Sequence, residues 1–116
     1  MNITFIGGGN MASALISGLL QQGYAAEQLR VVEINAESRE KIKHTLGVSA
    51  VAELADGVKG SDVILLAVKP QQLFELTQKL APLLNSQLIL SIAAGIRATD
   101  IIRWLGGYAR VVRAMP

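Results

Sequence analysis

The sequence has 116 residues, of which 51% are apolar and 17% charged, with no cysteine and a net charge of +2. This composition predicts one compact domain and excludes a disordered chain, a disulfide framework and a thiolate metal site. Because the Lys and Arg residues are scattered along the chain, nucleic acid is not expected as a partner. No apolar run approaches the roughly 20 residues of a membrane span and no signal-peptide pattern begins the chain, so we expect a cytoplasmic protein without a membrane partner.

Short apolar runs alternate with longer amphipathic segments along the chain. This alternation is typical of parallel strands joined by helical crossovers, and several of the runs are continuous enough for strands that are buried on both faces. Strands are predicted at residues 2–6, 30–34, 48–51, 63–68, 88–92 and 110–114. The predicted fold class is α/β: a Rossmann-type, doubly wound, mainly parallel sheet with helices on both faces, which spans residues 1–116.

The segments between these strands carry signals for the ends of helices. The first helix is predicted over residues 11–22, before a glycine. Asn35 is placed to cap the second helix, and Pro70 to open a helix that ends near residue 80. Thr99 is placed to cap a last short helix.

The strongest chemical signal is a G-x-G-x-x-A pattern between the first predicted strand and the first helix. Gly7 permits a tight turn, Gly9 lets the backbone approach a pyrophosphate, and Ala12 is small enough for close helix packing. A tight turn that binds nothing is the alternative, but the position between a strand and an amphipathic helix favours dinucleotide binding. The predicted contacts are Ile6, Gly7, Gly8, Gly9, Asn10 and Met11.

The residues after the second predicted strand bear on the choice between NAD and NADP. Glu33 ends that strand, about 20 residues after the glycine turn, where an acidic side chain can bind the adenosine ribose and favour NAD. Asn35 and Arg39 could instead hold a 2′-phosphate, or serve as a helix cap and a solvated surface charge. The sequence therefore leaves the cofactor as NADP or NAD.

Two further segments follow strands on the side of the sheet where open α/β folds bind ligands. The first is Ala67, Val68, Lys69 and Pro70, in which Lys69 either meets an anion or reaches solvent. The second is Ala93, Ala94 and Gly95, which are small enough for a nicotinamide ribose to lie against the backbone, or for close packing alone. No spacing suggests a nucleophile or a metal site, so we expect the chemistry to come from the cofactor, with no catalytic residue in this chain.

Taken together, four segments resemble the N-terminal half of pyrroline-5-carboxylate reductase, at residues 6–15, 67–71, 91–96 and 110–116. The resemblance covers the whole chain and implies NAD(P)H-dependent reduction of 1-pyrroline-5-carboxylate to L-proline, the last step of proline biosynthesis. It implies cofactor contacts from residues 6–11, 67–70 and 93–95, with Asn35 near the adenosine ribose or its 2′-phosphate. It also implies that Met115 and Pro116 begin the segment beside the nicotinamide.

Such enzymes continue into a helical C-terminal domain that forms the homo-oligomer and contributes the pocket for the small-molecule substrate. The resemblance therefore implies that this chain is a cofactor-binding fragment that cannot turn over alone. Family members often carry an asparagine near the adenine, and residues 52–54 of this chain, Ala-Glu-Leu, lack it. The alternatives are another two-domain Rossmann dehydrogenase of the β-hydroxyacid dehydrogenase type and a non-catalytic nucleotide-sensing module; residues 93–95 and 113–116 favour the reductase.

Overall fold

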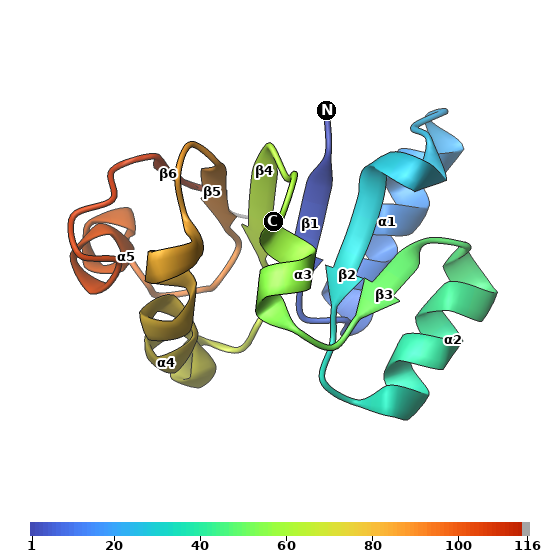
Figure 1. Cartoon of the computed structure of the whole chain (residues 1–116), viewed down its shortest axis with the longest axis horizontal. Helices are drawn as coiled ribbons and strands as arrows, with labels where there is room; N and C mark the ends of the chain where they lie inside the picture. The colour runs from blue at the N-terminus through green and yellow to red at the C-terminus, as the bar shows by residue number, and fades with distance from the viewer. Residues whose placement is uncertain (115–116) are drawn as a thin grey trace.

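The computed structural model describes residues 1–114, which form a six-stranded sheet flanked by helices (Figure 1). The strands pair in the order β3-β2-β1-β4-β5-β6, and every pairing is parallel. This is the strand order of a doubly wound Rossmann sheet, so the predicted fold class is confirmed. The strands are β1 (Ile3–Ile6), β2 (Leu29–Val32), β3 (Ser49–Val51), β4 (Val63–Leu66), β5 (Leu88–Ser91) and β6 (Val111–Arg113).

Within residues 1–114, five α-helices and two short 3-10 helices connect these strands. The α-helices are α1 (Asn10–Gln21), α2 (Ala36–Leu46), α3 (Leu54–Val58), α4 (Pro70–Leu80) and α5 (Ala98–Trp104). The 3-10 helices are η1 (Ala26–Gln28) and η2 (Ala81–Leu83). None of the helices within residues 1–114 combines the length and the apolar character that crossing a membrane requires.

Most of the predicted helix ends are confirmed, and one is wrong. The side-chain oxygen of Asn35 accepts the Ser38 N–H at 2.9 Å and caps α2, and Pro70 is the first residue of α4. Thr99 does not cap α5, because the helix begins one residue earlier and Thr99 lies inside its first turn. The Arg97 carbonyl already accepts the N–H groups of Asp100 and Ile101, which fixes the helical turn before Thr99 is reached.

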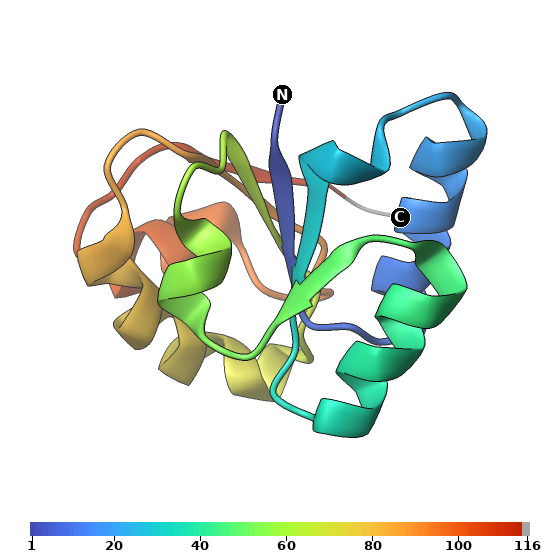
Figure 2. The same cartoon turned by 45° about the vertical axis from the view of Figure 1, so that its right-hand side comes forward.

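The core consists of two apolar clusters, one on each face of the sheet. Because successive side chains of a strand point to opposite faces, Phe5 packs with the cluster that contains Ile16 of α1, while its neighbour Ile6 packs with the cluster that contains Leu73 of α4. Figure 2 shows α1 and α2 on one side of the sheet and α3 and α4 on the other. Burial on both faces explains why several of the strands read as nearly continuous apolar runs.

The short helix α3, which was not predicted, lies directly against the sheet. A Cβ atom on Gly57 would lie 2.0 Å from Cγ2 of Val32, so only glycine allows this approach. The carbonyl oxygen of Gly57 accepts the hydroxyl of buried Thr4 at 2.7 Å, which satisfies the one polar side chain inside β1. Together these contacts hold α3 against β1 and β2.

The strand order fixes where a ligand can bind. The carboxyl end of β1 lies between those of β2 and β4, since Ile6 pairs with Val32 on one side and with Leu66 on the other. The connection after β1 leads to α1 on one face, and that after β4 leads to α4 on the other. Such a switch point opens a crevice at the carboxyl edge of the sheet.

Candidate functional site

The chain leaves β1 through a turn of three glycines that have different surroundings. Gly7 has φ +101°, and a Cβ atom there would lie 2.8 Å from the carbonyl oxygen of Ala67, so both its conformation and its surroundings require glycine. Its N–H donates to the carbonyl of Val32 at 2.9 Å and ties the turn to β2. Gly9 has an ordinary extended backbone, and a Cβ atom there would meet no atom within 4 Å.

Helix α1 begins at this turn with its first N–H groups uncapped. Gly9 is the N-cap residue, no side chain bonds the first turn, and that turn contains no acidic residue. By contrast, α2 has the Asn35 cap and Glu37 in its first turn. Free N–H groups and the positive end of the helix dipole favour an anionic group, and the space beside Gly9 leaves room for one.

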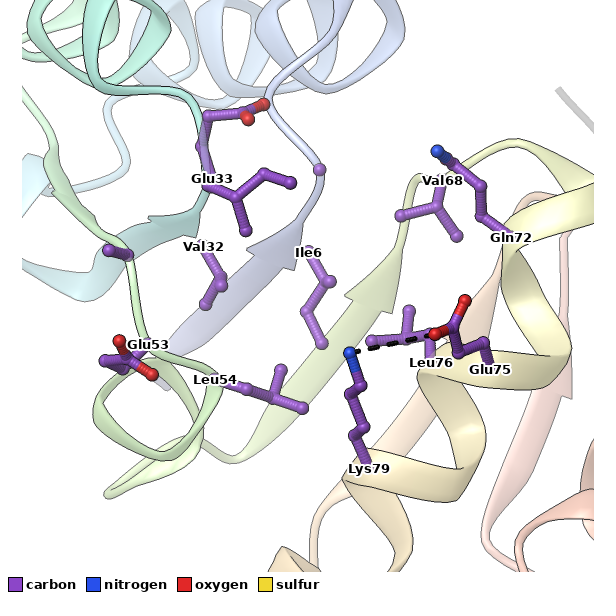
Figure 3. A pocket seen from close by; sticks show the side chains of 13 residues that line it. Ile6, Val32, Glu33, Glu53, Leu54, Val68, Gln72, Glu75, Leu76 and Lys79 are labelled. Carbon is purple, nitrogen blue, oxygen red and sulfur yellow. Dashed lines mark ion pairs between the residues drawn. The ribbon is translucent and has the colours of Figure 1, made fainter.

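A cavity of about 470 Å³ lies beside the glycine turn, between the ends of β1 and β2 on one side and α4 on the other (Figure 3). This volume lies within the range of roughly 300–1,000 Å³ that is typical of ligand pockets. Its walls combine apolar side chains with three carboxylates and one lysine. The residues that line it are Ile6, Gly7, Val32, Glu33, Ile34, Ala52, Glu53, Leu54, Val68, Gln72, Glu75, Leu76 and Lys79.

Glu33 connects the glycine turn to the beginning of α2. Its Oε1 accepts the N–H of Gly8 at 3.1 Å, and its Oε2 accepts the N–H of Asn35 at 3.0 Å. Arg39 reaches the same loop from α2, where its Nη1 donates to the carbonyl oxygens of Glu33 and Ile34, both at 2.9 Å. The carboxylate of Glu33 therefore lines the cavity, while Arg39 is anchored to backbone carbonyls and is not one of the lining residues.

The structure brings the predicted residues of the glycine turn, and most of those that follow β2 and β4, to this cavity or beside it. Those that line it are Ile6, Gly7, Glu33 and Val68. Those that contact these lining residues are Gly8, Asn35 and Ala67. Those that form the exposed beginning of α1 are Gly9, Asn10 and Met11.

The other predicted residues lie outside the cavity wall. Lys69 is the N-cap residue of α4, and both Lys69 and Pro70 are exposed. Ala93 is buried beyond β5 and donates its N–H to Oγ of Ser91 at 3.3 Å, whereas Ala94 and Gly95 are exposed in the turn that follows. Met115 and Pro116 lie outside the described residues. The roles of all these residues in cofactor binding stay predictions.

Sequence reasoning missed one wall of the cavity, which comes from α4 and the beginning of α3. Helix α3 has only five residues, too few for a periodic signal. The α4 wall did carry a signal, since Gln72, Glu75, Leu76 and Lys79 follow the i, i+3, i+4, i+7 spacing of one helix face. Within residues 1–114, no group of three or more acidic or histidine side chains is arranged to hold a metal ion.

Comparison with known proteins agrees with the fold and with the glycine turn. Residues 2–95 match the model of a family described as NADP oxidoreductase, coenzyme F420-dependent. The chain belongs to this family. The match begins one residue before β1 and ends in the turn after β5, so it contains the glycine turn and every residue that lines the cavity.

The resemblance to pyrroline-5-carboxylate reductases is also confirmed. The chain is 47% identical over 115 residues to pyrroline-5-carboxylate reductase of Pseudomonas aeruginosa, a match that covers 98% of the chain and 42% of that protein. The solved pyrroline-5-carboxylate reductase of Coxiella burnetii is 38% identical, with a TM-score of 0.93 over 99% of this chain and 43% of that one. The Plasmodium falciparum pyrroline carboxylate reductase, solved with NADP bound, is 23% identical, with a TM-score of 0.87. The match covers 100% of this chain and 42% of the Plasmodium chain, and at this identity it supports the fold alone. The chain thus spans less than half the length of these relatives.

Proposed function

We propose that this chain binds a nicotinamide dinucleotide, NADPH or NADH, at the carboxyl edge of its sheet. The observation that carries this proposal is the open space at Gly9, beside the uncapped first turn of α1. A diphosphate in that space would accept hydrogen bonds from the first N–H groups of the helix. The family description supports a dinucleotide as the ligand.

The cavity is the proposed site of the adenosine end of the cofactor. Its apolar walls, which include Leu54, Val68 and Leu76, suit the flat face of an adenine ring. The Glu33 carboxylate at its rim suits the ribose hydroxyls, because each carboxylate oxygen has lone pairs beyond the one that its backbone N–H uses. The nicotinamide end is proposed to lie toward the segments at 67–70 and 93–95, which follow β4 and β5.

We further propose that the chain is the cofactor-binding part of a pyrroline-5-carboxylate reductase that acts in proline biosynthesis. When bound, the reduced cofactor supplies a hydride for the imine carbon of the substrate. The identity to the Pseudomonas and Coxiella reductases over nearly the whole chain supports this assignment. The predicted cytoplasmic location and homo-oligomeric assembly belong to the same proposal.

Calorimetric titration of the chain with NADPH and with NADH tests the binding proposal. We expect saturable binding of at least one of them, and the absence of binding by both would contradict the proposed site.

Incubation of the 116-residue chain with NADPH and 1-pyrroline-5-carboxylate is expected to yield no appreciable proline, because the chain matches only 42% of the Pseudomonas reductase. Proline formation would overturn this expectation.

A chimera tests the reaction class. Residues 1–116 are joined to the portion of the Pseudomonas aeruginosa reductase that follows the matched region, and the matching part of the Coxiella burnetii enzyme is joined in the same way as a control. We expect both chimeras to reduce 1-pyrroline-5-carboxylate and neither to oxidise a β-hydroxyacid. An active control beside an inactive test chimera that still binds the dinucleotide would contradict the assignment and favour one of the alternatives.

A further inference from the structure

Three donors near the end of β2, where a 2′-phosphate would bind, already donate to groups of the protein itself: the N–H groups of Asn35 and Ser38, and Nη1 of Arg39. The N–H of Asn35 donates to Glu33 Oε2, and the N–H of Ser38 donates to the side chain of Asn35. The guanidinium of Arg39 is anchored through Nη1 to two carbonyl oxygens. A phosphate at this position would have to displace these bonds before it could accept hydrogen bonds from the same three donors.

The charges around the cavity also disfavour a 2′-phosphate. Three carboxylates line it, those of Glu33, Glu53 and Glu75, against the single cation of Lys79. Figure 3 shows Lys79 turned toward Glu75 on the α4 side, and the two form an ion pair at 4.0 Å. Glu33 lies on the opposite, β2 side of the cavity. A doubly charged phosphate would therefore meet a carboxylate where the ribose is expected to bind.

We propose that Glu33 makes this site selective for NADH over NADPH, an inference that rests on the proposed dinucleotide binding. Ribose hydroxyls are donors, and the Glu33 carboxylate can accept them while it keeps its bonds to the N–H groups of Gly8 and Asn35. A 2′-phosphate is only an acceptor at neutral pH, so it loses those hydrogen bonds and meets a like charge. Like charges placed side by side in a binding site reduce affinity by more than about tenfold.

The wild-type chain alone provides the first test. Calorimetric titrations with NADH and NADPH at the same ionic strength are expected to give a dissociation constant at least about tenfold lower for NADH. The probes 5′-AMP and adenosine 2′,5′-bisphosphate are expected to show the same preference for the adenosine end. Equal affinities, or tighter binding of NADPH, would overturn the role of Glu33 while the proposed function stands. Failure of both dinucleotides to bind would instead remove the proposed function.

Substitution of Glu33 tests whether this residue causes the preference for NADH. Glu33→Gln removes the charge but keeps an oxygen that can accept one of the two N–H groups, so it is expected to narrow the NADH preference by roughly tenfold. Glu40→Gln is the matched control, since it removes the same charge from an exposed position on α2 that does not line the cavity. Arg39→Ala should change the affinities for NADH and NADPH by the same factor, because Arg39 holds the backbone of Glu33 and Ile34 and is not expected to bind the phosphate. A selective loss of NADPH affinity in Arg39→Ala, or an equal effect of Glu33→Gln and Glu40→Gln, would overturn the proposal.

Discussion

Gly7 and Gly9 lie two positions apart in one turn, but the fold requires only the first of them. At Gly7 both the left-handed backbone and the nearby carbonyl of Ala67 exclude a side chain. At Gly9 the backbone is extended and the space beside it is open. The protein's own packing therefore explains one glycine, whereas the proposed ligand explains the other.

Gly9→Ala is expected to separate binding from stability. The free energy of unfolding should change by no more than about 1 kcal/mol, because alanine fits the backbone and meets no atom. Its Cβ would project into the space proposed for the diphosphate, so dinucleotide affinity should fall at least tenfold. Urea unfolding and calorimetric titration of the same preparation measure the two effects. Wild-type affinity in this variant would show that the space does not receive phosphate.

Gly7→Ala, unlike Gly9→Ala, is expected to lower the stability of the fold strongly. Alanine at φ +101° is strained, and its Cβ would collide with the Ala67 carbonyl, so the free energy of unfolding should fall by roughly 2–4 kcal/mol. Urea unfolding measures the loss, with Gly9→Ala as the matched control in the same turn. Equal stability of the two variants would contradict this account of the turn.

At the scale of elements, α2 provides the clearest local signal that the structure confirms. Asn35→Ala should lower the free energy of unfolding by about 1 kcal/mol, because the N–H of Ser38 loses its partner. Asn35→Ser should recover most of this loss, since a serine hydroxyl can cap the same group. Chemical denaturation of the three proteins tests the prediction, and equal losses in Ala and Ser would show that capping is not the cause.

All six strands were predicted, although the predicted ranges extend one or two residues beyond most strand ends. Strand and helix types follow from apolar periodicity and from caps such as Asn35, which are local. Helix α3 could not be predicted in this way, because its place depends on Gly57 fitting against Val32 of a distant strand. The same reason explains the missing cavity wall, since α3 and α4 approach β1 and β2 only after the sheet has formed.

At the scale of the whole molecule, the loop between α5 and β6 is tied to the beginning of β5. The hydroxyl of half-buried Tyr108 donates to the carbonyl oxygen of Gln87. Burial raises the pKa of the Tyr108 phenol above its ordinary value of 10.0, and the charge of Arg110 offsets part of this rise. The folded chain therefore disfavours the ionised phenol more than the unfolded chain does.

The pH dependence of stability follows from this raised pKa. Below about pH 10 the phenol is protonated in both states and its contribution is fully present; above that pH the unfolded chain ionises first and the contribution is lost. Relative to Tyr108→Phe, wild type should lose stability as the pH rises through about 10, by at most about 1.4 kcal/mol per pH unit. Urea unfolding at about pH 8 and pH 10.5 measures this, and a difference between the two proteins that does not change with pH would contradict it.

The sequence by itself determined the class of fold, the glycine turn and the acidic residue after the second strand, because backbone freedom and apolar periodicity are properties of short segments. Only the tertiary structure decided that the Glu33 carboxylate lines the cavity whereas Arg39 does not. The reason is that hydrogen bonds from Gly8 and Asn35 to the Glu33 carboxylate join residues from separate segments. The tertiary structure also decided which side chains enclose the cavity. Those contacts depend on the order in which the strands pair, and strand order depends on packing across the whole sheet.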